Sequence, residues 1–132
     1  MDIQYHVNKT VSVEQFRDVL NNSGLGERRP VEDSACLEGM LSNANLIVSA
    51  WENDTLIGIA RSVTDFHYAC YLSDLAVDQS KQSHGIGKQL QQLTREQLGP
   101  RCKLILVAAP AANDYYKKLG YENNPRCWIL SP

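Results

Sequence analysis

The sequence predicts a mixed α/β domain whose antiparallel first half leads into a parallel strand–helix–strand unit. Residues 46–52 and 55–63 are apolar and are separated by two polar residues, which is typical of a β-hairpin. Residues 85–98 carry apolar side chains at helical spacing. Residues 103–108 form a continuous aliphatic run, so we expect a strand that is covered on both faces and parallel to the strand before the helix.

Length and composition predict one domain spanning residues 1–132. The chain is 43% hydrophobic and 21% charged, and this size suffices for a core without metals or disulfides. Its four cysteines lie 34, 32 and 25 residues apart, so we expect free thiols and no metal site. Because no apolar run approaches the ~20 residues of a membrane helix, and no signal peptide is evident, we expect a soluble cytoplasmic protein without membrane contacts.

Charge is distributed unevenly along the chain. Residues 1–78 hold 12 acids and 5 bases, a balance of −7, whereas residues 79–132 hold 3 acids and 8 bases, a balance of +5. A polyanion beside the second half and a cation beside the first would suit this pattern. Chance variation explains it equally well, because salt screens surface charges beyond about 8 Å. Basic residues do not alternate with aromatic ones in a cluster, so we expect no nucleic-acid partner.

The first elements follow from alternation and capping signals. Apolar residues alternate over 3–7 as in an edge strand. A helix is expected from about Ser12, where Ser12 and Gln15 form a capping pattern, to about residue 24. Residues 25–30 are expected to form a loop, and residues 32–41 a second helix.

The second half contains the parallel unit. After the hairpin, a strand is expected over 67–77, followed by the helix over 85–98, which Gly99-Pro100 would end. A short helix over 110–120 should begin at its proline. Residues 126–130 are expected to form a final short strand, which could pair with a second subunit in a homodimer or be buried in its own sheet.

The most informative stretch is the polar loop between Val77 and the helix that begins at Gly85. The first turn of a helix leaves up to four N–H groups unpaired and carries about half a positive charge, so it favours phosphate. Gly85 and Gly87 remove side chains that would hold phosphates away, and Lys88 adds a charge. The loop matches neither the P-loop nor the dinucleotide signature.

The string Gln82-x-x-Gly85-x-Gly87, which follows a strand ending in Leu-Ala-Val-Asp, resembles the acyl-CoA pyrophosphate loop of the GNAT N-acetyltransferase superfamily. Residues 110–121, a helix with a tyrosine that ends in a Gly-aromatic pair, are similar to the family's closing segment. Together the two motifs cover about residues 70–121. The resemblance implies a V-shaped central sheet with about four helices, acetyl-CoA as the acyl donor, and an amine acceptor.

The resemblance also implies where the coenzyme lies. The strand end would pair with the acetyl carbonyl and pantetheine, and the loop would hold the pyrophosphate. One more residue, an asparagine one turn before the family tyrosine, would bind the pantetheine arm. The expected coenzyme-binding residues are Leu75, Ala76, Val77, Gln82, Ser83, His84, Gly85, Ile86, Gly87, Lys88 and Asn113.

Tyr116 matches the family tyrosine and is expected to be the catalytic residue that protonates the departing thiolate. Its neighbour Tyr115 shares a helix face with Leu119 and is expected in the core. Tyr71 stands where some members have a glutamate base, and strand alternation turns Asp74 to the opposite face, so a carboxylate base is not indicated.

The acceptor remains open at this point. The acidic first half suggests a cationic amine, while Arg28, Arg29 and Arg61 could hold a carboxylate or phosphate. We expect direct transfer to a primary amine of a small molecule. Transfer to a protein lysine or N-terminus is the alternative, as is a regulatory module that binds acyl-CoA without turnover.

Overall fold

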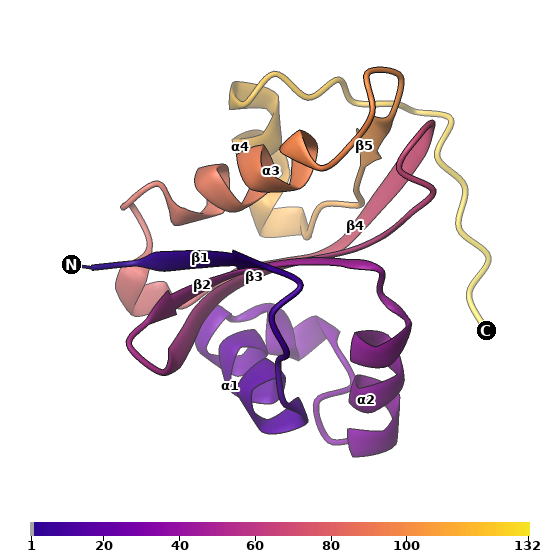
Figure 1. The fold of residues 1–132 in the computed structure, drawn as a ribbon. Coiled ribbons are helices and arrows are strands. Elements are labelled where there is room, and N and C mark those ends of the chain that lie inside the picture. Colours follow the sequence, from indigo (N-terminus) through magenta and orange to yellow (C-terminus); the bar gives the residue numbers. More distant parts are fainter. Residues whose placement is uncertain (1) are drawn as a thin grey trace.

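The structure is a computed structural model that describes residues 2–132, and it is built around one five-stranded sheet in the order β1-β2-β3-β4-β5 (Figure 1). The first four strands pair antiparallel and β5 pairs parallel with β4. The mixed sheet predicted from the sequence is therefore confirmed. The strands are β1 (Gln4–Val7), β2 (Leu46–Glu52), β3 (Thr55–Thr64), β4 (Ala69–Val77) and β5 (Lys103–Ile105).

Helices cover both sides of the sheet. In Figure 1, α1 and α2 lie below it and α3 and α4 lie above it. The helices are α1 (Val13–Ser23), α2 (Ser34–Asn43), α3 (Ile86–Glu96) and α4 (Asn113–Lys118). Three 3₁₀ turns also occur, namely η1 (Leu25–Arg28), η2 (Gln79–Lys81) and η3 (Pro110–Ala112). The segment expected as a loop over 25–30 is thus mostly a 3₁₀ turn.

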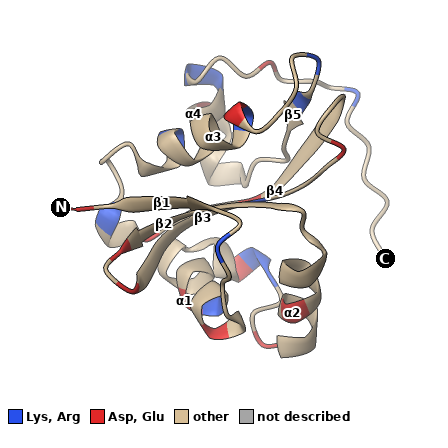
Figure 2. Ribbon diagram, viewed as in Figure 1, with Lys and Arg blue, Asp and Glu red and all other residues tan. Residues whose placement is uncertain are grey.

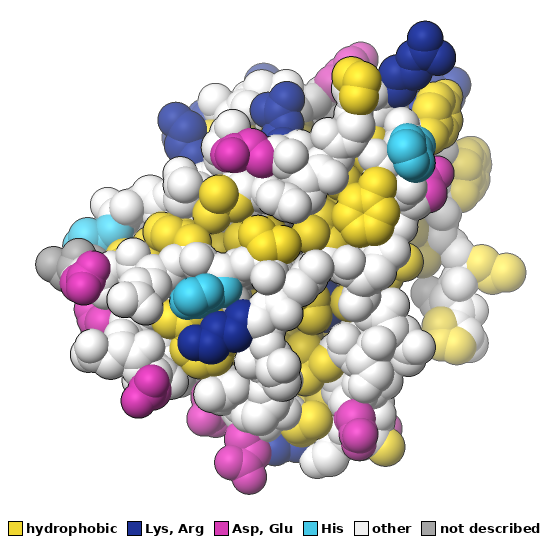
Figure 3. Space-filling model, in the orientation of Figure 1, with side chains coloured by type: hydrophobic (Ala, Val, Ile, Leu, Met, Phe, Trp, Pro, Cys, Tyr) yellow, Lys and Arg dark blue, Asp and Glu magenta, His cyan; other side chains and the backbone are white. Residues whose placement is uncertain are grey.

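The two layers of helices bury separate hydrophobic clusters. Phe16 and Leu20 of α1 pack below the sheet with Ile59 of β3, and all three side chains are fully buried. Leu90 of α3 packs above it with Val48 of β2. Figure 3 shows hydrophobic side chains gathered along the band between β1 and α3, where the upper cluster reaches the surface.

Caps set the helix boundaries. Ser12 accepts from the Gln15 N–H at 3.1 Å while the Gln15 side chain accepts from the Ser12 N–H at 2.9 Å, so the predicted capping box is present. The second helix begins two residues later than predicted, because the Asp33 side chain accepts from the Cys36 N–H at 3.0 Å and caps it there.

Strand β4 also begins two residues later than predicted, because Asp65 organises the preceding turn. Its carboxylate accepts the N–H groups of His67, Tyr68 and Ala69 at 2.8 to 3.0 Å. These backbone hydrogen bonds lower the pKa of Asp65 to about 2.

The Asp65 turn predicts a pH-dependent contribution to stability. The folded-state pKa lies below the unfolded value of about 3.9, so the stabilisation is complete above that pH and is lost as pH falls through about 2. The difference in unfolding free energy between wild type and Asp65→Ala should therefore narrow on acidification between pH 4 and 2, measured by urea titration. Asp18→Ala is the control, because the Asp18 carboxylate accepts no recorded hydrogen bond within residues 2–132. A difference in unfolding free energy between wild type and Asp65→Ala that grew on acidification would contradict the assignment.

The sheet opens between β4 and β5. These strands pair over only three positions, from Ala69 opposite Lys103 to Tyr71 opposite Ile105. Beyond Tyr71 the chain after β5 turns away, and no strand within residues 2–132 pairs with that edge of β4. The expected V-shaped opening is thus present.

Two predictions for the last third of the chain are wrong. Residues 103–108 are not a strand covered on both faces: β5 ends at Ile105, and Ile105 and Val107 are exposed while Leu104 and Leu106 pack against the upper cluster. Residues 126–130 form no strand in the structure, and Trp128 is 90% and Leu130 99% exposed. Their pairing with a second subunit stays a prediction.

Candidate functional site

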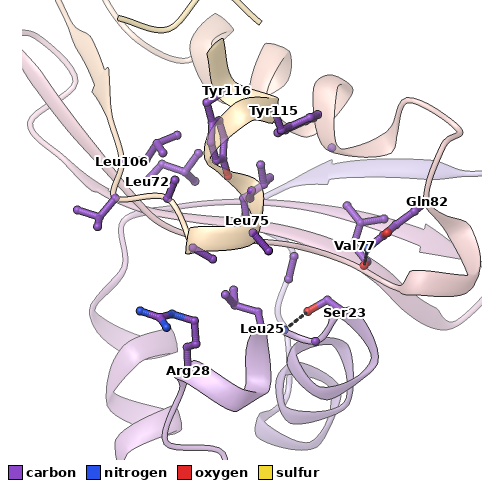
Figure 4. A pocket seen from close by; sticks show the side chains of 18 of the residues that line it. Ser23, Leu25, Arg28, Leu72, Leu75, Val77, Gln82, Leu106, Tyr115 and Tyr116 are labelled. Atoms are coloured by element: carbon purple, nitrogen blue, oxygen red, sulfur yellow. Dashed lines mark hydrogen bonds between the residues drawn. The ribbon is translucent and has the colours of Figure 1, made fainter. Parts of the chain in front are cut away.

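A cleft of about 1220 Å³ occupies the opening between β4 and β5. Its walls come from the end of β4, the loop before α3, the chain after β5, helix α4 and the 3₁₀ turn η1 (Figure 4). The site therefore combines the second half of the chain with one short turn from the first half.

Six consecutive backbone N–H groups at the start of α3 have no acceptor within residues 2–132. Gln82 N–H still bonds the Gln79 carbonyl at 3.4 Å, and Gln89 N–H bonds the Gly85 carbonyl at 3.0 Å. The N–H groups of residues 83–88 between them make no recorded hydrogen bond. Such a run, at the positive end of an eleven-residue helix, is a binding arrangement for a phosphate-sized anion.

The loop holds this shape through two residues with positive φ. Ser83 has φ 70° and Gly85 has φ 75°, the left-handed region that costs side-chain-bearing residues energy. Gly85 has open space around the position of a Cβ, so its requirement is conformational. A Cβ at Gly87 would lie 3.1 Å from the Tyr115 hydroxyl, so Gly87 gives room to that tyrosine rather than only to a phosphate.

Side chains anchor the first part of the loop, residues 78–82. Lys81 forms an ion pair with Glu52 of β2 at 2.9 Å. Asp78 accepts from the Ser80 N–H at 2.9 Å and caps η2. The Gln82 amide donates to the Val77 carbonyl at 3.2 Å, and this joins the loop to the end of β4.

The end of β4 directs backbone groups into the cleft, of which the Val77 carbonyl is bound by the Gln82 amide. The Asp78 N–H donates to Ile57 of β3 at 2.8 Å. In an antiparallel pair, residues whose backbone groups bond to the partner strand alternate with residues whose groups point away from it. The backbone groups of Leu75 and Val77 therefore face away from β3, into the opening, while those of Ala76 face β3. The edge can therefore accept an extended amide-bearing ligand as an added strand.

Tyr116 projects from α4 into the cleft with its hydroxyl directed toward β4 (Figure 4). The hydroxyl makes no recorded hydrogen bond within residues 2–132. Burial, with a smaller contribution from Tyr115, raises the pKa of Tyr116 above its usual 10.0. At neutral pH the phenol is protonated, which is the form a proton donor needs.

The expectation that Tyr115 lies in the core is wrong. Tyr115 is 39% exposed and lines the cleft, and Tyr116 is the more buried of the two. Helix α4 is only six residues long. The Tyr116 ring makes T-shaped contacts with the rings of Tyr115 and Tyr121, at centroid distances of 5.2 and 5.4 Å.

Gln91 of α3 binds two tyrosines near the cleft, and the sequence reasoning missed it. Its amide nitrogen donates to the Tyr115 hydroxyl at 3.3 Å, and its oxygen accepts from Tyr121 at 2.6 Å. Burial raises the pKa of Tyr121 to about 12, so that phenol remains a donor to Gln91. The sequence signal was a glutamine on the apolar side of an amphipathic helix. The structure shows that this side chain is buried, where polar groups need hydrogen-bond partners.

Two predicted residues do not line the cleft. Asn113 is exposed at the start of α4, and His84 is exposed in the loop, where its Nδ1 lies 3.0 Å from the Lys81 and Gln82 carbonyls. The other nine predicted coenzyme-binding residues and Tyr116 do line it: Leu75, Ala76, Val77, Gln82, Ser83, Gly85, Ile86, Gly87 and Lys88.

Asp74 has a structural arrangement. It is fully buried, and its two oxygens accept from Arg29 Nε and Arg61 Nε, each at 2.5 Å. Both carboxylate oxygens are thus bound by guanidinium groups, and the side chain is not among those that line the cleft. Asp74 is not placed to accept a proton from a ligand.

A family model described as an acetyltransferase (GNAT) domain matches residues 11–126. The chain belongs to the GNAT acetyltransferase family. A curated relative, described as an uncharacterized N-acetyltransferase ycf52 from Pyropia yezoensis, is 26% identical in an alignment of 133 positions that covers 94% of this chain and 72% of that protein. The family assignment agrees with the resemblance found in the loop and the closing segment.

Solved GNAT structures share the fold. A GNAT family protein from Streptococcus pneumoniae superposes with a TM-score of 0.78 at 21% identity, covering 99% of this chain and 100% of that one. An aminoglycoside N-acetyltransferase, AAC(6')-Iy, in complex with CoA gives a TM-score of 0.73 at 18% identity, covering 99% and 95%. At this identity the likeness supports the fold.

Two other kinds of feature are not found in residues 2–132 of this GNAT chain. No helix in residues 2–132 is both long and apolar enough to span a membrane. Across the same residues, no three His, Cys, Asp or Glu side chains gather as a metal site would need.

Proposed function

We propose that this GNAT chain transfers an acetyl group from acetyl-CoA to the primary amine of a small molecule, by direct attack while both are bound. The six unpaired N–H groups of residues 83–88, at the positive end of α3, are the observation that carries the proposal. A pyrophosphate would accept several of them, with the Lys88 charge beside it.

The acyl arm of the coenzyme would extend from the loop along the open edge of β4. The backbone groups of Leu75 and Val77 face this opening, and pantetheine amides resemble the strand that is missing there. The Val77 N–H would donate to the thioester oxygen and stabilise the charge that develops on it.

In the reaction the amine nitrogen forms a bond to the carbonyl carbon, and the carbon–sulfur bond breaks. The nitrogen loses one proton and the sulfur gains one, so no net proton is consumed. The Tyr116 phenol, kept protonated by its raised pKa, would donate to the sulfur. Asp74 is already bound by two arginines, so the proton from the amine would leave through water in the cleft.

The acceptor would be small because η1 closes one side of the cleft. Leu25 and Arg28 of η1 face Leu75 and Tyr116 across the cavity (Figure 4). Such a wall favours a compact amine over an extended peptide.

Ligand-dependent stabilisation followed by turnover tests the proposal. Acetyl-CoA at 100 times its dissociation constant should add about 2.7 kcal/mol to the unfolding free energy, CoA should also stabilise, and NADH should not. Release of free thiol from acetyl-CoA in the presence of amines then measures transfer. Stabilisation by NADH alone, or no thiol release with any amine, would contradict the proposal.

Gly85→Ala should raise the dissociation constant for acetyl-CoA about tenfold, because a left-handed alanine costs about 1–2 kcal/mol and the loop would relax away from its binding shape. Isothermal titration calorimetry measures the change. Gly39→Ala is the matched control, since its Cβ also meets open space but its φ is not positive. Equal affinities for the two variants would show that the loop conformation does not matter.

A further inference from the structure

The wall of the cleft formed by η1 contains an arginine whose charge is not neutralised. Arg28 is exposed, lines the cleft, and makes no ion pair and no side-chain hydrogen bond within residues 2–132. In Figure 4 its guanidinium lies at the end of the cavity away from Gln82, on the same side as Leu72 and Leu106.

The two other arginines near this wall are already engaged. Arg29 and Arg61 share the buried Asp74, Arg29 also donates to the Ser73 carbonyl at 2.8 Å, and Arg61 to the Met40 carbonyl at 3.1 Å. Their donors are held by the protein. The sequence suggested three arginines as anion-binding residues. Of these, Arg28 is therefore the one whose guanidinium N–H groups are free to bind a ligand.

The acidic side chain nearest in sequence does not neutralise Arg28. Glu27 also lines the cleft, but the two side chains form no ion pair in the structure. Arg29 and Arg61 share Asp74, and Glu27 is the neighbour of Arg28, so this group of three arginines and two acids carries one net positive charge. The overall −7 of residues 1–78 thus does not describe the local field, because basic segments lie among the acidic ones on the α1 and α2 side of the sheet (Figure 2).

We propose that Arg28 binds a carboxylate on the acceptor, so that the substrates are amines with an apolar skeleton and a carboxylate. This rests on the proposed acetyl transfer at the same cleft. The surface between Arg28 and the Tyr116 hydroxyl is formed by Leu25, Leu72 and Leu75, which suits a hydrocarbon skeleton, and a guanidinium binds a carboxylate through two parallel hydrogen bonds. Arg28 is a specificity residue that touches the acceptor and not the coenzyme.

Matched pairs of amines that differ only in the carboxylate test this assignment. Suitable pairs are leucine and 3-methylbutylamine, phenylalanine and phenethylamine, and 6-aminohexanoate and pentylamine, with thiol release as the readout. For at least one pair, the carboxylate member should have a KM at least tenfold lower, with kcat similar for both.

Arg28→Gln should raise the KM of that carboxylate member about tenfold, since glutamine removes the positive charge and the paired donors that bind the carboxylate. The KM of its decarboxylated partner, the KM of acetyl-CoA and both kcat values should stay unchanged. Arg28→Lys should restore part of the preference, and Arg28→Glu should reverse it. Arg101→Gln, an exposed arginine outside the cleft, is the matched control and should change nothing.

The outcomes separate this inference from the proposed function. If amines are acetylated but the carboxylate members show no lower KM, or if Arg28→Gln raises the KM of both members equally, the role of Arg28 is wrong while acetyl transfer stands. A raised KM for acetyl-CoA in Arg28→Gln would place this side chain on the coenzyme and also overturn the inference. If no amine is acetylated, titration calorimetry of the same pairs with the CoA-loaded chain, wild type and Arg28→Gln, still decides whether Arg28 binds the carboxylate.

Discussion

Tyr116→Phe is expected to lower kcat about 100-fold, the lower range for loss of a general acid, while the dissociation constant for acetyl-CoA stays unchanged. The variant removes only the hydroxyl oxygen, which lies in the cleft and makes no recorded hydrogen bond within residues 2–132. Its ring contacts with Tyr115 and Tyr121 remain, so the fold should not change. Thiol release under saturating substrates measures kcat, and calorimetry measures coenzyme binding.

The control for this variant is Tyr68→Phe. Tyr68 is 63% exposed and lies outside the cleft, with Lys103 over its ring, so loss of its hydroxyl should leave kcat at the wild-type value. Wild-type turnover in Tyr116→Phe would exclude the phenol as proton donor. A weaker coenzyme affinity with unchanged kcat would instead make Tyr116 a binding residue.

Asp74→Asn is expected to lower the unfolding free energy by about 3 kcal/mol, at the lower end of the cost of breaking a buried ion pair because Arg29 remains partly exposed. The amide keeps the shape of the side chain but leaves Arg61, which is nearly fully buried, without a counter-charge. The loss should appear in urea titration as a lower midpoint with an unchanged slope.

Asp74→Asn should also loosen the wall of the cleft that η1 forms, because Arg29 connects η1 to β4 through Asp74 and the Ser73 carbonyl. Asp18→Asn, on the exposed side of α1, should change the unfolding free energy by less than about 0.5 kcal/mol. An equally small change in Asp74→Asn would show that the two guanidiniums do not depend on this carboxylate.

The sequence sufficed where local signals act through the backbone. The capping box at Ser12, the hairpin between β2 and β3, and the glycine-bearing start of α3 all have short-range causes, and each is present in the structure. The opening between β4 and β5 was expected from the family resemblance rather than from the residues themselves.

The predictions that are wrong concern which neighbour covers a given face. The run at 103–108 was expected to be covered on both faces and the run at 126–130 to form a strand. Burial depends on what packs against a segment, and in the structure only one side of 103–108 is packed and residues 126–130 are exposed. Tyr115 was assigned to the core by helical periodicity, which is unreliable over the single turn and a half of α4. The use of Arg29 and Arg61 by Asp74, which leaves Arg28 free, is a long-range pairing that spacing does not reveal.

The left-handed residues Ser83 and Gly85 have a consequence for how the coenzyme would arrive. The ion pair of Lys81 with Glu52 and the hydrogen bond from Gln82 to Val77 hold the loop, so part of the entropic cost of orienting its amides is met during folding rather than at association. Coenzyme binding at the loop before α3 would then need little rearrangement of the main chain, so such a rearrangement would not limit its rate.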